Sequence, residues 1–225
     1  MKFIFDYLAD LEQNNNREWY HANKERLQQA TAQFERFIGE LIAAIAEFDS
    51  SVIHNTPKDL TFKMVRDTRF SHDKSPYNPK FRAHISSEGK QPIPVGYYIV
   101  FAPGNRSFLG GGLFASMFKD ATEMIRDHIA AHGREFDAII KSKEFATHFM
   151  VKGEALKNIP RGYDADHPQA EYLKNKSWYL EYFVTDGQIA DNDSFLRYAA
   201  TLFRFMKPFN DYLNTALEGF TMPSR

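Results

Sequence analysis

Residues 80–114 read KFRAHISSEGKQPIPVGYYIVFAPGNRSFLGGGLF, and this stretch decides the fold class. Apolar residues alternate in KFRAHIS (80–86), and VGYYIVFAP (95–103) is almost continuously apolar, which predicts two strands. GNRSFLGGGLF (104–114) indicates a third strand of this group, which follows a Pro-Gly-Asn turn. Because the connections are short, we expect these strands to pair antiparallel.

The same alternation continues upstream of this stretch. It predicts a strand over Lys63–Phe70, with successive side chains on opposite faces. Residues 70–80, FSHDKSPYNPK, contain two prolines and are expected to form a loop, because proline cannot donate to a ladder. A further strand is predicted in SWYLEYFVTDG (177–187), which gives a mainly antiparallel sheet of about four to six strands.

Helices are expected before the strands. The spacing of Phe5, Leu8 and Leu11 predicts a short opening helix. Asn16 is the expected N-cap of the next helix, an amphipathic segment about nine turns long that stops near Asp49.

Helices are also expected after the strands. Residues 115–133 have helical periodicity, with Met117 on the apolar side and Gly133 as the C-cap. A long C-terminal helix is predicted over 195–217. Strands bracketed by long N- and C-terminal helices indicate a single α+β domain over residues 1–225.

The composition excludes several classes of function. The chain has no cysteine, so disulfides, zinc-thiolate sites and cysteine nucleophiles are ruled out. Its net charge of −1 provides no global attraction to nucleic acid or anionic lipid. No stretch approaches the ~20 apolar residues of a bilayer span, and Asp6 and Asp10 interrupt any signal sequence. We therefore expect a cytoplasmic protein without membrane or nucleic-acid partners; composition indicates neither a cofactor nor an oligomeric state.

One segment nevertheless concentrates charge. Residues 58–90 hold eight basic and four acidic side chains, so they carry +4 and the rest of the chain carries −5. The centre of this segment is VRDTRFSHDKSPY (65–77), where Arg66 faces away from Asp67 and Arg69 on the predicted strand. A guanidinium on an apolar face is costly unless it is paired or binds an anion.

Two interpretations of this segment stay open. In the first, it binds a phosphate- or carboxylate-bearing small molecule, as a binding protein or an enzyme. Its candidate ligand-binding residues are Arg66, Arg69, Lys74 and Arg82. Its candidates for catalysis are Asp67, Asp73 and Tyr77. In the second interpretation, the same charges form a structural ion-pair network in a non-catalytic binding or interaction module.

KMVRDTRFSHDKSPY (63–77) resembles the signature of a bacterial family of conserved hypothetical proteins, close to RxxRDxRFxxDKxxY. The residues that match it are Arg66, Asp67, Arg69, Phe70, Asp73, Lys74 and Tyr77. Lys63 stands where the signature has arginine, which keeps the charge but loses the bidentate fork. LKNIPRGYDADHPQAEYLKNKS (156–177) resembles a second block of the family. On that resemblance, further ligand-binding candidates for the opposite wall of the site are Arg161, His167 and Lys176. The resemblance implies an identity but no reaction.

Other motifs have both a functional and a structural interpretation. Gly110–Gly112 offers amides for a phosphate, although a bulge or close packing is favoured. Glu88–Lys90 superficially resembles part of a nuclease motif but lies in a predicted turn. Asp164–His167 contains potential metal ligands that are favoured as local caps, and no histidine spacing supports a zinc site. The aromatic residues, Tyr97 and Tyr98 among them, are assigned to the core rather than to base stacking.

Overall fold

The predicted sheet is present in the computed structural model, which describes residues 1–114 and 118–223. Within these residues, four antiparallel strands are arranged in the order β1-β2-β3-β4. The strands are β1 (Phe81–Ile85), β2 (Tyr97–Phe101), β3 (Ser107–Leu113) and β4 (Trp178–Val184). Helices precede and follow the sheet, so the predicted α+β class is confirmed.

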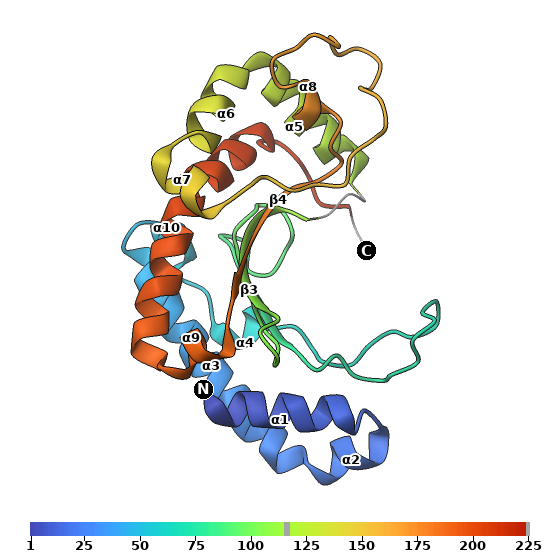
Figure 1. The fold of residues 1–225 in the computed structure, drawn as a ribbon, viewed down its shortest axis with the longest axis vertical. Coiled ribbons are helices and arrows are strands. Elements are labelled where there is room, and N and C mark those ends of the chain that lie inside the picture. The colour runs from blue at the N-terminus through green and yellow to red at the C-terminus, as the bar shows by residue number, and fades with distance from the viewer. Residues whose placement is uncertain (115–117, 224–225) are drawn as a thin grey trace.

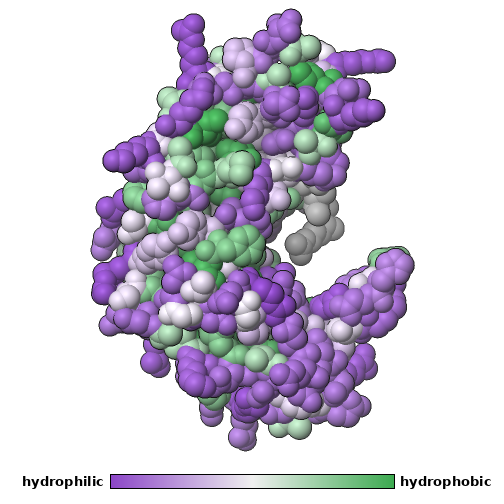
Figure 2. Space-filling view, in the orientation of Figure 1, coloured by the Kyte–Doolittle hydropathy of each residue, from purple (hydrophilic) through white to green (hydrophobic). Residues whose placement is uncertain are grey.

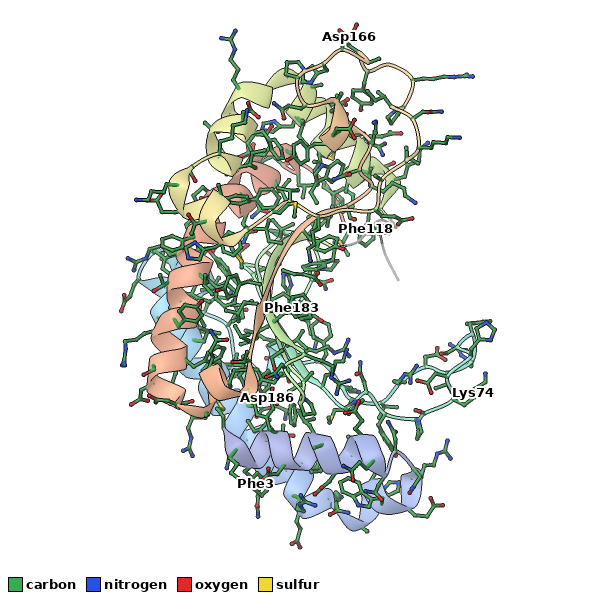
Figure 3. All side chains as sticks on the ribbon, viewed as in Figure 1. Phe3, Lys74, Phe118, Asp166, Phe183 and Asp186 are labelled. Carbon is green, nitrogen blue, oxygen red and sulfur yellow. The ribbon has the colours of Figure 1, made fainter. Side chains whose placement is uncertain are left out.

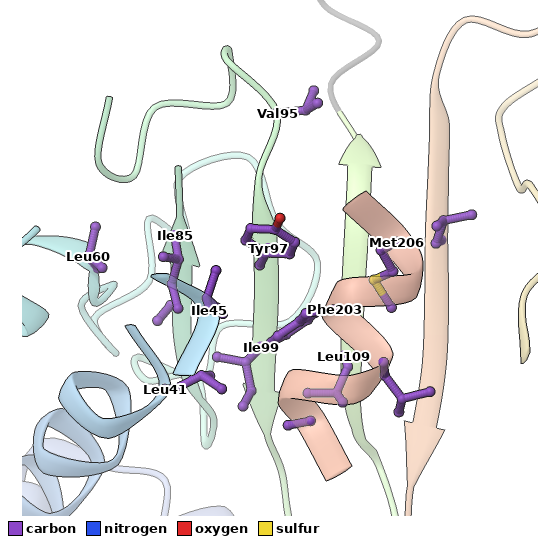
Figure 4. Packing of buried hydrophobic residues seen from close by; sticks show 14 of the residues in the cluster. Leu41, Ile45, Leu60, Ile85, Val95, Tyr97, Ile99, Leu109, Phe203 and Met206 are labelled. Atoms are coloured by element: carbon purple, nitrogen blue, oxygen red, sulfur yellow. The ribbon is translucent and has the colours of Figure 1, made fainter. Parts of the chain in front are cut away.

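One face of the sheet forms the core. Helices α3 (Lys24–Ala46) and α10 (Asn192–Ala216) cover this face, because each presents an apolar stripe at helical spacing. Figure 4 shows the packing between these helices and the strands. Fully or almost fully buried residues at this contact include Leu41, Ile45, Tyr97, Ile99, Leu109, Phe203 and Met206.

The remaining helices extend past both ends of the sheet, so the outline is a crescent (Figure 1). At one end lie α1 (Lys2–Gln13) and α2 (Arg17–Ala22). At the other lie α5 (Lys119–Ala131), α6 (Gly133–Ile140), α7 (Lys143–His148) and α8 (Ala170–Leu173). The short elements are η1 (Ser50–Val52), α4 (Pro57–Leu60) and α9 (Asp186–Ala190). No helix in the described part of the chain is long and apolar enough to cross a membrane.

The predicted nine-turn helix is divided in two. Asn16 is its N-cap as predicted, and the Asn16 side chain accepts a hydrogen bond from the Trp19 backbone amide at 2.8 Å. The helix then ends at Asn23, where both the backbone amide and the side-chain amide donate to the Trp19 carbonyl. An asparagine side chain that competes for backbone partners favours a helix end, and this explains the break.

The helix after β3 also differs from its prediction. Its C-cap is His132, and Gly133 instead begins the next helix, α6. A single residue therefore joins the two helices, so no left-handed glycine cap is used. The predicted position of Met117 lies outside the described residues.

The predicted strand over Lys63–Phe70 is wrong. Residues 61–80 form a projecting two-legged arm, called the arm below, which pairs with β1 only through an isolated bridge between Thr61 and Ala83. Beyond that bridge the two legs pair with each other, with hydrogen bonds from Arg66 to Pro76 and from Asn78 to Met64. The arm extends past the end of β1, and prolines supply no donors, so no continuous ladder forms. Figure 2 shows the arm as a mostly hydrophilic projection.

Candidate functional site

The sheet face opposite α3 and α10 looks toward the concave side of the crescent (Figure 1). The strand register places its side chains in rows that cross the sheet, because directly paired residues share a face. One row is Arg82, Val100, Phe108 and Phe183. The next row is His84, Tyr98, Gly110 and Glu181. Polar and aromatic side chains from all four strands therefore share one open face of the sheet.

Aromatic rings form a continuous strip across this face. The ring centroids of Tyr98 and Phe108 are 6.0 Å apart, and those of Phe108 and Phe183 are 5.7 Å apart. Phe114 stacks on Tyr179 at 4.6 Å, with 24° between the ring planes. We call the whole group the aromatic strip, and its members are Phe62, Tyr98, Phe108, Phe114, Tyr179 and Phe183.

The strip corrects the assignment of the aromatic residues to the core. Tyr97 is buried as predicted, but Tyr98 points to the opposite, open face. Phe114 and Phe183 are 39% and 56% exposed. Apolar runs predict that strands are covered on both faces, whereas here helices cover one face only.

The three glycines of β3 make room for this arrangement. A Cβ atom on Gly110 would lie 3.1 Å from Cζ of Phe114, so the missing side chain leaves space for that ring. On the other side, a Cβ on Gly111 would lie 2.9 Å from Oδ1 of Asn210 in α10. The amide of Gly112, a residue with φ of +82°, donates to the same oxygen at 2.8 Å. The favoured interpretation of close packing is confirmed.

A hollow of about 760 Å³ lies over one part of the strip, and we call it the concave-face hollow. Its aromatic lining comes from Phe62, Tyr98, Phe108 and Phe114. Its polar and charged lining includes Lys63, His84, Lys90, Gln91 and Glu181. A concave site with a mainly apolar lining and a few polar groups is the usual form of a small-molecule site.

His84 lines this hollow from β1 and is only 7% exposed. Burial lowers the pKa of its imidazole to about 4, against the opposing effect of backbone hydrogen bonds at Gln91 and Lys90. The ring is therefore uncharged at neutral pH. The alternation in KFRAHIS puts His84 on the face opposite Ala83 and Ile85, but it gives no sign that this face carries a hollow, so His84 was not predicted as a site residue.

Arg82, a predicted ligand-binding residue, lies beside the same hollow. Its guanidinium carbon is 5.3 Å from the centroid of the Phe62 ring, and Nη2 donates to the Lys63 carbonyl at 3.4 Å. Its buried Nε has no hydrogen-bond partner among the described residues. Burial raises the pKa of Tyr98, and the nearby Arg82 guanidinium acts in the opposite direction. Arg82, a cation with an unused hydrogen-bond donor, thus borders the aromatic lining of the concave-face hollow.

Most of the other predicted site residues lie on the arm, away from this hollow. At its tip, Arg69 forms a bidentate pair with Asp67, the shortest contact being 2.6 Å, and Lys74 donates to the Thr68 carbonyl. Asp67 and Arg69, which the sequence placed on the same side of the chain, are thus partners of each other. Hydrogen bonds from Arg69 lower the pKa of Asp67 and hold it ionised.

Closer to the body, Arg66 pairs with Asp73 across the two legs. Hydrogen bonds from Ser75, and then the contact with Arg66, lower the pKa of Asp73 well below its usual range. These residues border a second, open hollow of about 390 Å³ that also includes Lys80 and Arg106. Arg106 is itself paired with Glu12 at 2.6 Å, so both arginines of this hollow face carboxylates.

Tyr77 lies at the root of the arm and is 6% exposed. Its ring stacks on Tyr20 of α2. The side chain of Asn15 accepts from the Tyr77 amide at 3.1 Å and donates to the Tyr77 carbonyl at 2.9 Å. Tyr77 therefore anchors the arm instead of standing free on a loop beside Lys74.

The second block of the family resemblance lies in the far end of the crescent. Asp166 marks this end in Figure 3, and Lys74 marks the distant arm tip. Arg161 is exposed, His167 interacts with the Ala130 carbonyl and the Gln169 amide, and Lys176 pairs with Glu154. The structure does not bring these candidates together with the arm residues.

The motifs with metal-binding potential have local partners. The side chain of Asp164 accepts from the Asp166 amide at 2.9 Å, which confirms a local turn. In the searched part of the chain, no group of three or more histidine, aspartate or glutamate residues is placed to hold a metal ion. Ser86 and Gly89 bridge to each other, which confirms that Glu88–Lys90 lies in a turn.

The described residues thus form an α+β fold with one antiparallel sheet, one face of which is an open, aromatic and partly cationic surface. The chain belongs to the family of conserved hypothetical proteins DUF2461, whose family model matches residues 3–212. This match confirms the family resemblance inferred from the charged signature. Neither the curated proteins nor the solved structures that were searched contain a match.

Proposed function

We propose that this protein binds a small organic anion with a flat apolar body in the concave-face hollow. The observation that supports this proposal is the convergence of four aromatic side chains with lysines in a single hollow. The proposal keeps the anionic ligand predicted from the sequence, but it places the ligand on the sheet rather than on the arm.

The charge around the hollow favours an anion. Lys63 and Lys90 line it, and Arg82 lies at its edge. The carboxylate in the lining, Glu181, is paired with Lys152 at 3.1 Å. These five side chains together carry +3 at neutral pH in a protein of net charge −1. Arg82 is half-buried, and a partly desolvated cation attracts a ligand anion more strongly than a fully hydrated one does.

The apolar lining favours a ligand with a ring. Removing apolar surface from water contributes roughly 25 cal/mol per Å², so burying about 100 Å² of a ligand contributes roughly 2.5 kcal/mol. The uncharged imidazole of His84 and the phenol of Tyr98 supply hydrogen-bonding groups without adding charge. Apolar contact, hydrogen bonding and an ionic contact are thus available within one site.

Thermal unfolding with matched ligands tests this proposal. Phenyl phosphate is expected to raise the Tm more than inorganic phosphate or neutral benzyl alcohol at the same concentration, because only phenyl phosphate uses both the rings and the lysines. A ligand at about 100 times its Kd stabilises the folded state by roughly 2.7 kcal/mol. Lys63→Met and Phe108→Ala are each expected to reduce the shift.

Lys74→Met is the matched control, because Lys74 lies at the arm tip, away from the hollow. It should leave the shift unchanged. The proposal fails if phenyl phosphate gives no shift beyond that of inorganic phosphate, or if Lys74→Met removes the shift as completely as Lys63→Met.

The arm supports the second interpretation, an interaction module. Phe70 is 94% exposed near the arm tip, and the neighbouring Arg69 is already paired with Asp67. Exposed aromatic side chains are typical of protein contacts. Phe70→Ser should then abolish cross-linking of the arm to a partner protein, while the Tm shift caused by phenyl phosphate persists. If Phe70→Ser removes the Tm shift but leaves the cross-linking unchanged, the arm has no separate interaction role.

A further inference from the structure

We propose that the aromatic strip, together with the concave-face hollow, binds single-stranded nucleic acid. This inference rests on the proposed function and specifies its ligand: the flat body is a nucleobase, and the anion is a backbone phosphate. It differs from the expectation drawn from net charge, because the charge of this face and that of the whole chain have opposite signs.

The strip is longer than the hollow. The hollow contains Phe108 and Phe114, and beyond it the strip continues on β4 with Tyr179 and Phe183. Strands are spaced by roughly 4.8 Å, so the four strands extend across about 14 Å. The exposed rings of Phe114 and Phe183 offer separate stacking positions, one in the hollow and one outside it. A single small ring does not use both positions.

Cations lie at both ends of the strip. At one end, Nζ of Lys152, which pairs with Glu181, is 5.6 Å from the Phe183 ring. At the other end, the Arg82 guanidinium lies over Phe62. Phosphates at intervals along a strand complement this spacing of positive charge. Glu181, which lines the hollow, pairs with Lys152 through Oε2, and its second oxygen can accept from the exocyclic amino group of a base.

The arm adds positive charge at the rim of the same concave side (Figures 1 and 2). Residues 61–80 contain five lysines and arginines and two aspartates, a net charge of +3, which leaves −4 for the rest of the chain. Aromatic stacking positions combined with a cationic path are the features that bind single strands without a sequence motif. A duplex keeps its bases stacked on each other and cannot use the rings.

Fluorescence anisotropy with labelled oligo(dT) of about eight nucleotides tests this inference, because sites on single-strand binding folds span roughly 4–16 nucleotides. Calorimetry with thymidine monophosphate measures the contribution of the hollow alone. We expect the oligonucleotide to bind more tightly than the mononucleotide and a duplex of the same length to compete poorly. Binding should weaken with salt, because phosphate contacts release counterions.

Phe183→Ala and Lys152→Met probe the part of the strip outside the hollow. Each is expected to weaken oligonucleotide binding roughly five- to tenfold and to leave binding of the mononucleotide unchanged. Phe183→Tyr should retain the affinity, because it retains a stacking ring. Ile53→Ala, a change at an exposed apolar residue outside the strip, is the matched control. Thermal melts of all four variants verify folding.

Equal affinity for the oligonucleotide and the mononucleotide overturns the inference, as does equal competition by duplex. If phenyl phosphate stabilises the protein but neither thymidine ligand binds, the nucleic-acid inference fails and the proposed function stands. If none of the three ligands binds, both fail.

Discussion

The rings of Tyr20 and Tyr77 lie parallel, with centroids 3.7 Å apart and 8° between their planes. This stack joins α2 to the root of the arm, two parts of the chain that are distant in sequence. Together with the paired hydrogen bonds of Asn15, it fixes the direction in which the arm leaves the body. Burial and ring stacking both stabilise the contact.

Tyr77→Ala is therefore expected to destabilise the fold by about 3 kcal/mol, the usual cost of removing a buried aromatic ring. Urea unfolding measures this change. Amide hydrogen exchange should also accelerate at Arg66 and Asn78, whose amides pair across the legs of the arm. Tyr77→Phe keeps the ring and serves as the control; a loss of stability as large as that of Tyr77→Ala would show that the stack is not the stabilising contact.

The stability of the protein should depend on His84 between about pH 4 and pH 6.5. The folded pKa, about 4, is below the ordinary value of 6.5, so the unfolded chain binds the proton more readily in this range. The free energy of unfolding should consequently fall as the pH is lowered, by up to about 1.4 kcal/mol per pH unit from this residue. His84→Gln should reduce that slope in urea unfolding measured at several pH values.

His72→Gln is the matched control for His84, because His72 is an exposed histidine of the arm. It should unfold with the same pH dependence as the wild type. Identical slopes for the wild type and His84→Gln would show that burial does not hold this imidazole neutral.

The carboxylate of Asp73 gives a pH dependence of its own. Its folded pKa lies below the ordinary value of 3.8, so its stabilising effect is present above that value and is lost as the pH falls through the folded pKa. Asp73→Asn should lower the Tm at pH 7 and differ progressively less from the wild type in acid. Asp166→Asn, at an exposed position in the far end of the crescent, is the control and should leave the Tm at pH 7 unchanged. Equal Tm changes in the two variants would contradict the role of the Ser75 and Arg66 contacts.

Two glycines should respond to alanine in opposite directions. Gly112→Ala places a Cβ at 2.4 Å from the Trp178 carbonyl on backbone with positive φ, so a loss of about 3 kcal/mol or more is expected. Gly39→Ala lies within α3, and its Cβ would make only an ordinary 3.4 Å contact with Pro57. It should stabilise the protein by up to about 1 kcal/mol. Thermal unfolding of both variants measures these changes. A gain in stability from Gly112→Ala would show that the backbone at residue 112 is not constrained.

The sheet could be predicted from sequence because local periodicity encodes strands. KFRAHIS and SWYLEYFVTDG alternate visibly, and β1 and β4 form there. The arm could not be predicted, because an extended segment has the same sequence pattern whether it joins a sheet or pairs with the segment that follows it. The deciding fact is that the arm runs past the end of β1, which is a property of the tertiary arrangement.

The candidate site was predictable only in part. The sequence placed Asp67 and Arg69 on the same side of the chain, since residues two apart on an extended chain share a side, and the two side chains do pair. The role of His84 and Tyr98 was not predictable, because it depends on which face of the sheet the helices leave uncovered. The sequence separates the two faces of β2 but contains no local signal for which face is open.

The attachment of the arm has a mechanical consequence. Its root is held by Asn15 and Tyr20, at the α1–α2 end of the crescent, while its tip near Lys74 projects away from the other described residues (Figure 3). The arm is thus held at one end only, so a force applied at Phe70 acts most strongly on the contacts of Tyr77 at the root. Force from a contact at the tip is therefore transmitted at the root both to α1 and α2 and, through the Thr61–Ala83 bridge, to β1 of the sheet.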